Sequence, residues 1–216
     1  MEDSVQLENK WGAALLLRMY DMVLRGIPYV SEPVTDLVKS YTDKYGYTDK
    51  AIKKFVDNQI IKCSTTGFLT GLGGLLVMPL SVPADLASSL YMEMRMIVGI
   101  AIIRGYDPYD EAVKTAVYLC LVGNAATTIL NDVGVKIATN IAYNKLLPLL
   151  SNKVINGVNQ VVGRQVLTKA GTKGLVNGSK LVPIAGGIVS AVFNGFEVAS
   201  FAKIAKKRFN KIDGSY

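Results

Sequence analysis

An uncharged stretch between Lys62 and Asp85 constrains the fold of this chain more than any other feature. A helix that spans a membrane needs about 20 apolar residues whose backbone groups all bond within the helix. This stretch has 22 uncharged residues, but glycines and prolines interrupt it. The interruptions predict a helix end, a bend and a second helix, which form a buried hydrophobic hairpin over residues 48–105. The expected hinge positions are Gly67, Gly71, Gly73, Gly74, Pro83 and Gly105.

The composition excludes several kinds of chemistry. The chain has 216 residues, half of them hydrophobic, and no histidine; its mean hydropathy is +0.29. Without histidine it cannot form a Ser-His-Asp triad or a histidine-containing zinc site. Its two cysteines, Cys63 and Cys120, lie in apolar helical sequence and are expected to be buried, reduced thiols. We therefore expect no enzymatic activity, no cofactor and no metal.

Apolar residues recur at helical spacing through most of the chain, and no segment alternates convincingly as a strand does. The prediction is an all-α fold, a single multi-helix domain over residues 1–216 built around the glycine-bent hairpin. Helices over 1–47 precede the hairpin at 48–105, and a helical second half follows over 106–216, basic from residue 133.

Capping residues predict where the helices begin and end. Ser31, Thr48 and Asp107 are expected N-caps, with Pro108 in the first turn after Asp107. Gly105 is expected to close the second hairpin helix in a left-handed conformation. A loop is expected over 169–180. The first arm of the hairpin is expected to begin at Thr48. The other expected helices cover 7–25, 31–46, 82–104, 107–130, 131–150, 152–168 and 183–210.

Charge is distributed unevenly along the chain. Residues 1–132 hold 12 basic and 15 acidic side chains, whereas residues 133–216 hold 12 basic and 2 acidic. A half with a net charge of +10 predicts a polyanionic partner, although a merely solvated basic face remains the alternative. The C-terminal cluster comprises Lys203, Lys206, Lys207, Arg208 and Lys211.

An anionic membrane surface or lipid suits this basic half better than nucleic acid does. Sequence-tolerant binders of single-stranded nucleic acid interleave aromatic residues with basic ones, but residues 133–180 contain one aromatic, Tyr143. The basic residues alternate instead with aliphatic ones at helical spacing, as in helices that lie on a membrane surface. Nucleic acid is therefore an unlikely partner.

The second hairpin helix carries four charged residues, Asp85, Glu93, Arg95 and Arg104, on an otherwise apolar body. Asp85 falls in the first turn, where a carboxylate favours the helix N-terminus. Arg95 is expected to pair with a carboxylate from another helix, because a buried charge needs a partner. The alternative is that these residues bind an anionic headgroup or a partner protein.

Several short patterns recur along the chain: G-x-x-T-G-x-G-G at 67–74, V-P-A-D-L at 82–86, E-x-R at 93–95 and L-V-P-I-A-G-G at 181–187. Together they resemble the EcsC family of bacterial proteins. The resemblance spans roughly residues 50–210 and implies an all-helical protein that is cytosolic or membrane-associated; the founding member is encoded beside an ABC transporter. No catalytic residue is carried over, and Glu93 stands where glutamine is usual.

The sequence thus predicts a non-catalytic protein that associates peripherally with the cytoplasmic membrane, or with a membrane complex such as a transporter. Its polar, acidic N-terminus predicts no signal peptide and a cytoplasmic location at the inner face of the membrane. One alternative is a soluble adaptor or immunity-type protein whose basic face binds an acidic protein partner. The other is an integral protein with spans at Cys63–Ala84, Thr115–Asn131 and Leu181–Phe196.

Overall fold

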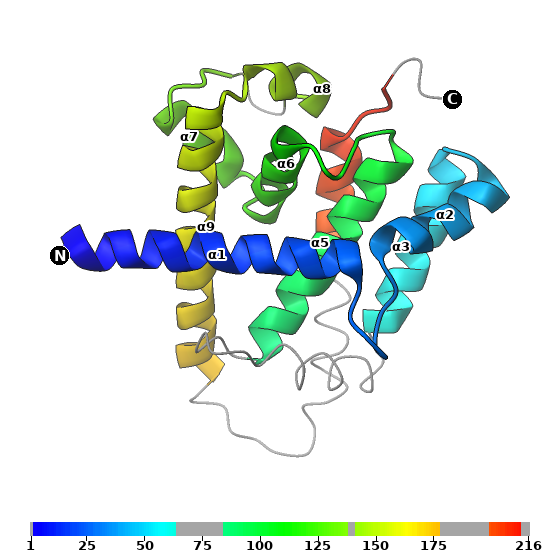
Figure 1. Ribbon diagram of the computed structural model, residues 1–216, viewed down its shortest axis with the longest axis horizontal. Helices are drawn as coiled ribbons and strands as arrows, with labels where there is room; N and C mark the ends of the chain where they lie inside the picture. The colour runs from blue at the N-terminus through cyan, green and yellow to red at the C-terminus, as the bar shows by residue number, and fades with distance from the viewer. Residues whose placement is uncertain (1, 64–83, 138–140, 178–198, 213–216) are drawn as a thin grey trace.

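A computed structural model describes residues 2–63, 84–137, 141–177 and 199–212, and this part of the chain is all-α, as the sequence predicts. It contains helices and turns but no strand. Residues 199–208 form a further helix that carries no label in Figure 1. The labelled elements are α1 (Glu2–Arg25), α2 (Val34–Tyr45), α3 (Asp49–Cys63), α5 (Ala84–Ile103), α6 (Glu111–Leu121), α7 (Ala125–Asp132), α8 (Tyr143–Leu146), the 3₁₀ turn η1 (Leu147–Leu149) and α9 (Asn152–Asn177).

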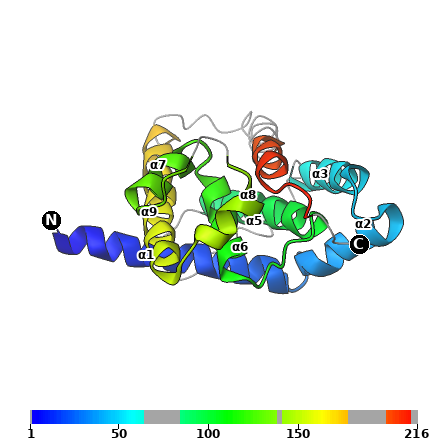
Figure 2. The same ribbon diagram turned by 90° about the horizontal axis from the view of Figure 1, so that it is seen from above.

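Helix α5 lies at the centre of the molecule. All side chains from Leu90 to Ala101 are buried, which requires neighbours on every side of the helix. Those neighbours are α1, α2, α3 and α6. Seen from above, α2 and α3 lie at one end of the molecule, α7 and α9 lie at the other, and α5 runs between them (Figure 2).

The two arms of the predicted hairpin are neighbours, because α3 packs against α5. At this contact the ring of Phe55 lies where a Cβ on Gly99 would sit, so the glycine admits the aromatic ring. The bend itself, with Gly67, Gly71, Gly73, Gly74 and Pro83, lies outside the described residues. Gly105 has φ +92°, which confirms the left-handed end predicted for α5.

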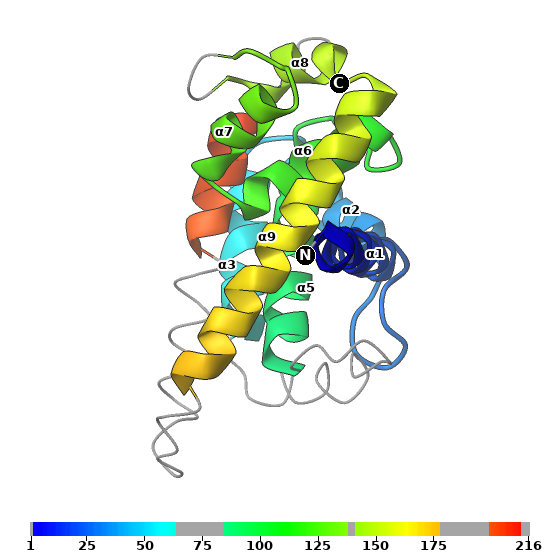
Figure 3. The ribbon, with the colours of Figure 1, turned by 90° about the vertical axis from the view of Figure 1, so that its left-hand side faces the viewer.

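Helix α1 crosses α9 at a contact between two glycine backbones. Figure 3 shows α1 nearly end-on as it passes beside α9. A Cβ built on Gly12 would overlap the carbonyl carbon of Gly163, and one built on Gly163 would overlap that of Gly12. No larger residue fits at either position without separating the helices, so this pair sets how closely α1 and α9 approach.

The N-cap predictions were partly wrong. Thr48 does cap α3, since its hydroxyl accepts the amide hydrogen of Ala51 at 3.2 Å. Ser31 does not cap α2; Pro33 holds the N-cap position, and the Ser31 hydroxyl lies 2.6 Å from the hydroxyl of Tyr91. Asp107 does not cap α6, because its carboxylate accepts from the amide of Tyr109, two residues on, at 2.9 Å.

Asp110 is the N-cap of α6. Its carboxylate accepts hydrogen bonds from the amides of Ala112 at 2.7 Å and Val113 at 3.2 Å. We expect Asp110→Ala to lower the free energy of unfolding by about 1 kcal/mol, as loss of an N-cap does. Urea denaturation measures the change. Asp107→Ala is the control, and an equal or larger loss there would show that Asp107 rather than Asp110 carries the cap.

The expected helices over 107–130 and 131–150 were also wrong. Gly123 has φ +57° and separates α6 from α7, so the first expected helix is two shorter ones. The second is largely not helical where the structure describes it: α7 ends at Asp132, and of residues 133–137 and 141–150 only those of α8 and η1 are helical. In contrast, α9 continues to Asn177, so the loop expected at 169–180 is helical up to that residue.

Candidate functional site

Four exposed lysines near the C-terminus form what we call the lysine surface: Lys203, Lys206 and Lys207 of the helix over 199–208, and Lys211 three residues beyond its end. On the same segment Ala202, Ala205 and Phe209 are buried. Because residues three and four apart share a helix face, the apolar face packs on the domain and the three lysines of the helix point to solvent. Four of the five predicted C-terminal residues are thus exposed on one short segment.

No carboxylate neutralises the lysine surface within the described part of the chain. Beyond Val133, the described segments 133–137, 141–177 and 199–212 contain no aspartate or glutamate. The ion pairs formed between described residues all lie earlier, from Arg25–Asp21 to Lys114–Glu111. Within the described residues, none of the four lysines is therefore balanced by an ion pair.

Arg208 does not belong to this surface, although the sequence grouped it with the lysines. It is only 4% exposed, its guanidinium lies 5.9 Å from the centre of the Tyr143 ring, and it donates to the carbonyl of Ile141 at 3.5 Å. Delocalised charge lets arginine stack on an aromatic face in this way. Arg208 fastens the C-terminal helix to the domain.

Two of the predicted charged residues, Glu93 in α5 and Arg104 just after it, bind groups within the protein. Glu93 accepts from the hydroxyl of Ser89 at 2.9 Å. Arg104 pairs with Asp49 at 2.7 Å, across the start of α3. Asp85 is the second residue of α5, but its side chain lies outside the description. None of these contacts joins them to the lysine surface, so the sequence-predicted residues do not form a single site.

Among the described residues Arg95 has no carboxylate partner, so the structure does not show the predicted interhelical ion pair. The side chain is 2% exposed and donates to the backbone carbonyl of Glu32 at 2.7 Å and to the hydroxyl of Tyr91 at 3.2 Å. Charged donors form stronger hydrogen bonds than neutral ones. Arg95 thereby holds the loop between α1 and α2 against the core.

That loop, residues 26–33, is a feature that the sequence reasoning missed. The amide of Val30 donates to the carbonyl of Ile27 at 3.0 Å, which closes a turn with Pro28 and Tyr29 in its central positions. Tyr29 has φ +63° and is the only non-glycine residue with positive φ in the described chain. Such a turn normally places glycine or asparagine there, and tyrosine raises its energy by roughly 1–2 kcal/mol.

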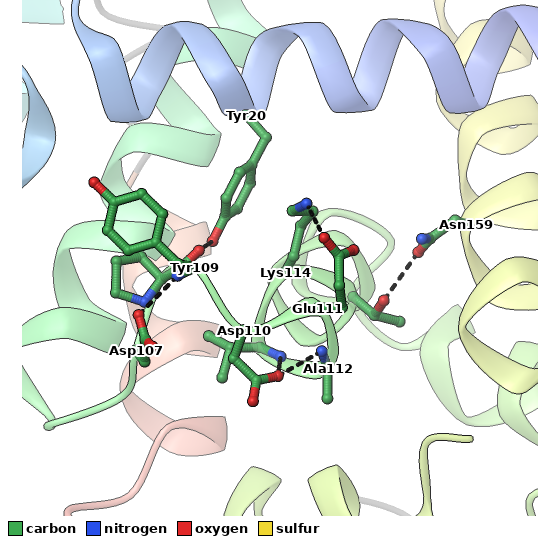
Figure 4. A network of polar contacts seen from close by, with 11 residues as sticks. Tyr20, Asp107, Tyr109, Asp110, Glu111, Ala112, Lys114 and Asn159 are labelled. Carbon is green, nitrogen blue, oxygen red and sulfur yellow. Dashed lines mark hydrogen bonds and ion pairs between the residues drawn. The ribbon is translucent and has the colours of Figure 1, made fainter. Parts of the chain in front are cut away.

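A second polar cluster lies between α1, α6 and α9 (Figure 4). Tyr20 donates to the carbonyl of Pro108 at 2.7 Å. Lys114 pairs with Glu111 at 2.6 Å and lies 5.6 Å from the centre of the Tyr20 ring. Burial raises the pKa of Tyr20, with a further contribution from Glu111. The phenol therefore stays protonated, and these groups join helices and do not form a proton-transfer pair.

Tyr118 lines a pocket with a volume of about 290 Å³ beside this cluster. Its hydroxyl is buried without a hydrogen-bond partner among the described residues. Burial raises the pKa of this hydroxyl too, and its oxygen is closed off from the surface. The Tyr118 phenol is therefore neither an activated nucleophile nor an accessible base.

The remaining chemistry of the described residues is also limited. No group of three histidine, cysteine, aspartate or glutamate side chains there could hold a metal ion. Cys120 is buried, as the sequence predicts, and burial raises the pKa of its thiol to about 12. At neutral pH it is a thiol and not the reactive thiolate. In the same residues no helix combines the length and apolarity needed to cross a bilayer.

Comparison with known proteins identifies no relative. No protein-family model matches the chain, and neither a curated protein nor a solved structure matches it. A functional argument therefore depends on the lysine surface, the strained loop and the composition of the chain.

Proposed function

We propose that this chain is a non-catalytic protein that binds peripherally to an anionic membrane surface at the cytoplasmic face, through the lysine surface. The observation that carries the proposal is the set of exposed, unneutralised lysines at 203, 206, 207 and 211. The resemblance to the EcsC family supports it, because that resemblance implies a cytosolic or membrane-associated protein.

The expected affinity is moderate and depends on salt. Each lysine near an anionic surface contributes about 1 kcal/mol. Four such residues on one short segment are therefore sufficient for reversible adsorption. Mobile ions screen this attraction over about 8 Å at physiological ionic strength, so binding should weaken steeply as salt is added.

Flotation of the purified protein with vesicles tests the proposal. The wild type is expected to float with phosphatidylglycerol-containing vesicles at low salt, but not with pure phosphatidylcholine vesicles or at high salt. Replacement of Lys203, Lys206, Lys207 and Lys211 by alanine is expected to weaken binding by about 100-fold or more, because roughly 3–4 kcal/mol of attraction is removed. Arg208 is left in place because it is buried.

The matched control removes the same number of charges from another surface. Lys44 of α2 and Lys50, Lys53 and Lys54 of α3 are all exposed, so their replacement by alanine changes the net charge equally. Equal loss of binding in both variants would mean that binding depends on net charge and not on the lysine surface. A wild type that ignores anionic vesicles would favour instead an acidic protein partner.

A further inference from the structure

The pocket of about 290 Å³ lies in the angle between α1 and α9, with α6 as its third wall. The two helices cross steeply at the Gly12–Gly163 contact and diverge on either side of it (Figure 1). Beside the crossing, two of the three α1 residues that line the pocket are Ala13 and Ala14, which are too short to fill the space. The pocket thus follows from the helix crossing, and its volume suits a small ligand.

The two charged groups that line the pocket neutralise each other. Lys114 and Glu111 of α6 pair at 2.6 Å, and the lysine side chain is only 14% exposed. Its ammonium group also lies 5.6 Å from the centre of the Tyr20 ring. Figure 4 shows this pair in the space between α1 and α9. A charged ligand would have to break the pair and lose its own hydration, so the pocket favours an uncharged ligand.

Carboxamides supply most of the remaining polar lining. Asn156, Asn159 and Gln160 of α9 all line the pocket, because residues three and four apart share one helix face. The Asn159 carbonyl oxygen accepts from the hydroxyl of Thr115 at 3.2 Å, which leaves its amino group for a ligand. Asn156 and Gln160 are exposed, and their side chains form no hydrogen bond with the rest of the described chain. Each carboxamide offers two donors and an acceptor oxygen.

We propose that this pocket binds a small uncharged ligand that carries several hydroxyl groups, such as a monosaccharide. A hydroxyl group both donates and accepts, so it can pair with either end of a carboxamide. A sugar ring also has an apolar C–H face, which matches the alanines and Leu17 on the α1 wall. The Tyr118 hydroxyl takes no part, because its oxygen is closed off from the pocket. The inference is independent of the proposed membrane function and adds a second site to the molecule.

Nuclear magnetic resonance of the side-chain amides tests binding directly. The ¹⁵N-labelled protein is titrated separately with glucose, galactose and mannose. The amide signals of Asn156, Asn159 and Gln160 are expected to shift with at least one sugar, with a dissociation constant on the order of 1 mM for a ligand of about 12 heavy atoms. Glucuronate, which adds a carboxylate to the same ring, is expected to bind roughly tenfold more weakly. Cyclohexanol, a ring with one hydroxyl group, is expected to give no saturable shift.

Two variants with a matched control assign the binding to the pocket. The double variant Asn156→Ala, Gln160→Ala is expected to bind sugar roughly tenfold more weakly, because two hydrogen bonds are lost. Its melting temperature should not change, since both side chains are exposed. The control variant Asn144→Ala, Asn152→Ala also removes two exposed carboxamides, but outside the pocket, and is expected to bind as the wild type does. Ala14→Phe places a ring in the pocket and is expected to abolish binding.

Several results would overturn the proposal. One is the absence of a saturable shift with all three sugars. Equal binding of cyclohexanol would assign the affinity to the apolar wall, and equal or tighter binding of glucuronate would show that the Lys114–Glu111 pair opens to an anion. Equal affinity of the double variant and its control would place the sugar elsewhere. The double variant decides the location even if Ala14→Phe melts at a lower temperature. None of these results affects the membrane proposal, which vesicle flotation tests separately.

Discussion

Gly163→Ala is expected to lower the free energy of unfolding by about 3 kcal/mol, at the upper end of the range for overpacked contacts. The added methyl group would overlap the backbone of Gly12 and Ala13. Backbone atoms cannot move aside by changing rotamer, so α1 must separate from α9. Urea denaturation followed by circular dichroism measures the loss, and Gly12→Ala should reproduce it.

Gly157→Ala is the matched control on the same helix. A Cβ there would lie 3.2 Å from a methyl carbon of Val133, a side chain that can shift slightly. Alanine is the better helix former, so this variant is expected to be neutral or more stable by up to about 1 kcal/mol. If Gly163→Ala behaved like Gly157→Ala, the close crossing of α1 and α9 would be incorrect.

Phe209→Ala is expected to have the largest effect, about 3–5 kcal/mol, as for other buried phenylalanines. The side chain is fully buried, and its ring meets those of Tyr106 and Tyr143 edge-on at 5.0 and 4.8 Å between centroids. The change removes these contacts and leaves a cavity where the C-terminal segment joins the domain. Thermal and chemical denaturation measure the loss.

Phe201→Ala is the control within the same C-terminal segment. Phe201 is only partly buried, so its truncation is expected to lower the free energy of unfolding by about 1 kcal/mol. Equal losses for the two variants would mean that Phe209 does not anchor the segment. Release of the segment by Phe209→Ala should also weaken vesicle binding, since the lysines would no longer be held on one surface.

Helix content was predictable from the sequence because apolar periodicity extends over long segments. The ends of α1, α2 and α5 were predictable too, since Gly26, Gly46 and Gly105 all have positive φ where those helices stop. The start of α6 was not. Asp107 and Asp110 are both good N-cap residues. In the structure the Asp107 carboxylate accepts from the amide of Tyr109, so Asp110 is left to cap the helix.

Glycine content alone did not predict where α9 ends, and nothing in the sequence indicated its contact with α1. The glycines at 171 and 174 suggested a loop, yet α9 continues through both. The Gly12–Gly163 contact joins residues that are distant in the sequence, and neither local pattern indicates it.

The candidate site, too, was predictable only in part. A basic cluster is visible in the sequence, and helical spacing separates Lys203 and Lys207 from buried Ala202 and Ala205. Helical spacing does not show that Arg208 stacks on Tyr143 instead of joining the exposed lysines. No sequence pattern singled out Tyr29, although Pro28 before it favours a turn and could have indicated the loop.

The contact between α1 and α9 has a consequence for synthesis on the ribosome. Helix α1 is complete once residue 25 is made, but its partner begins only at residue 152. At cellular translation rates the delay is roughly ten seconds. Throughout that interval the face of α1 that packs on α9 in the finished domain lacks its cover. The nascent chain should therefore present an early binding site for chaperones that recognise apolar helices, and it should lose that site only when the last third of the protein emerges.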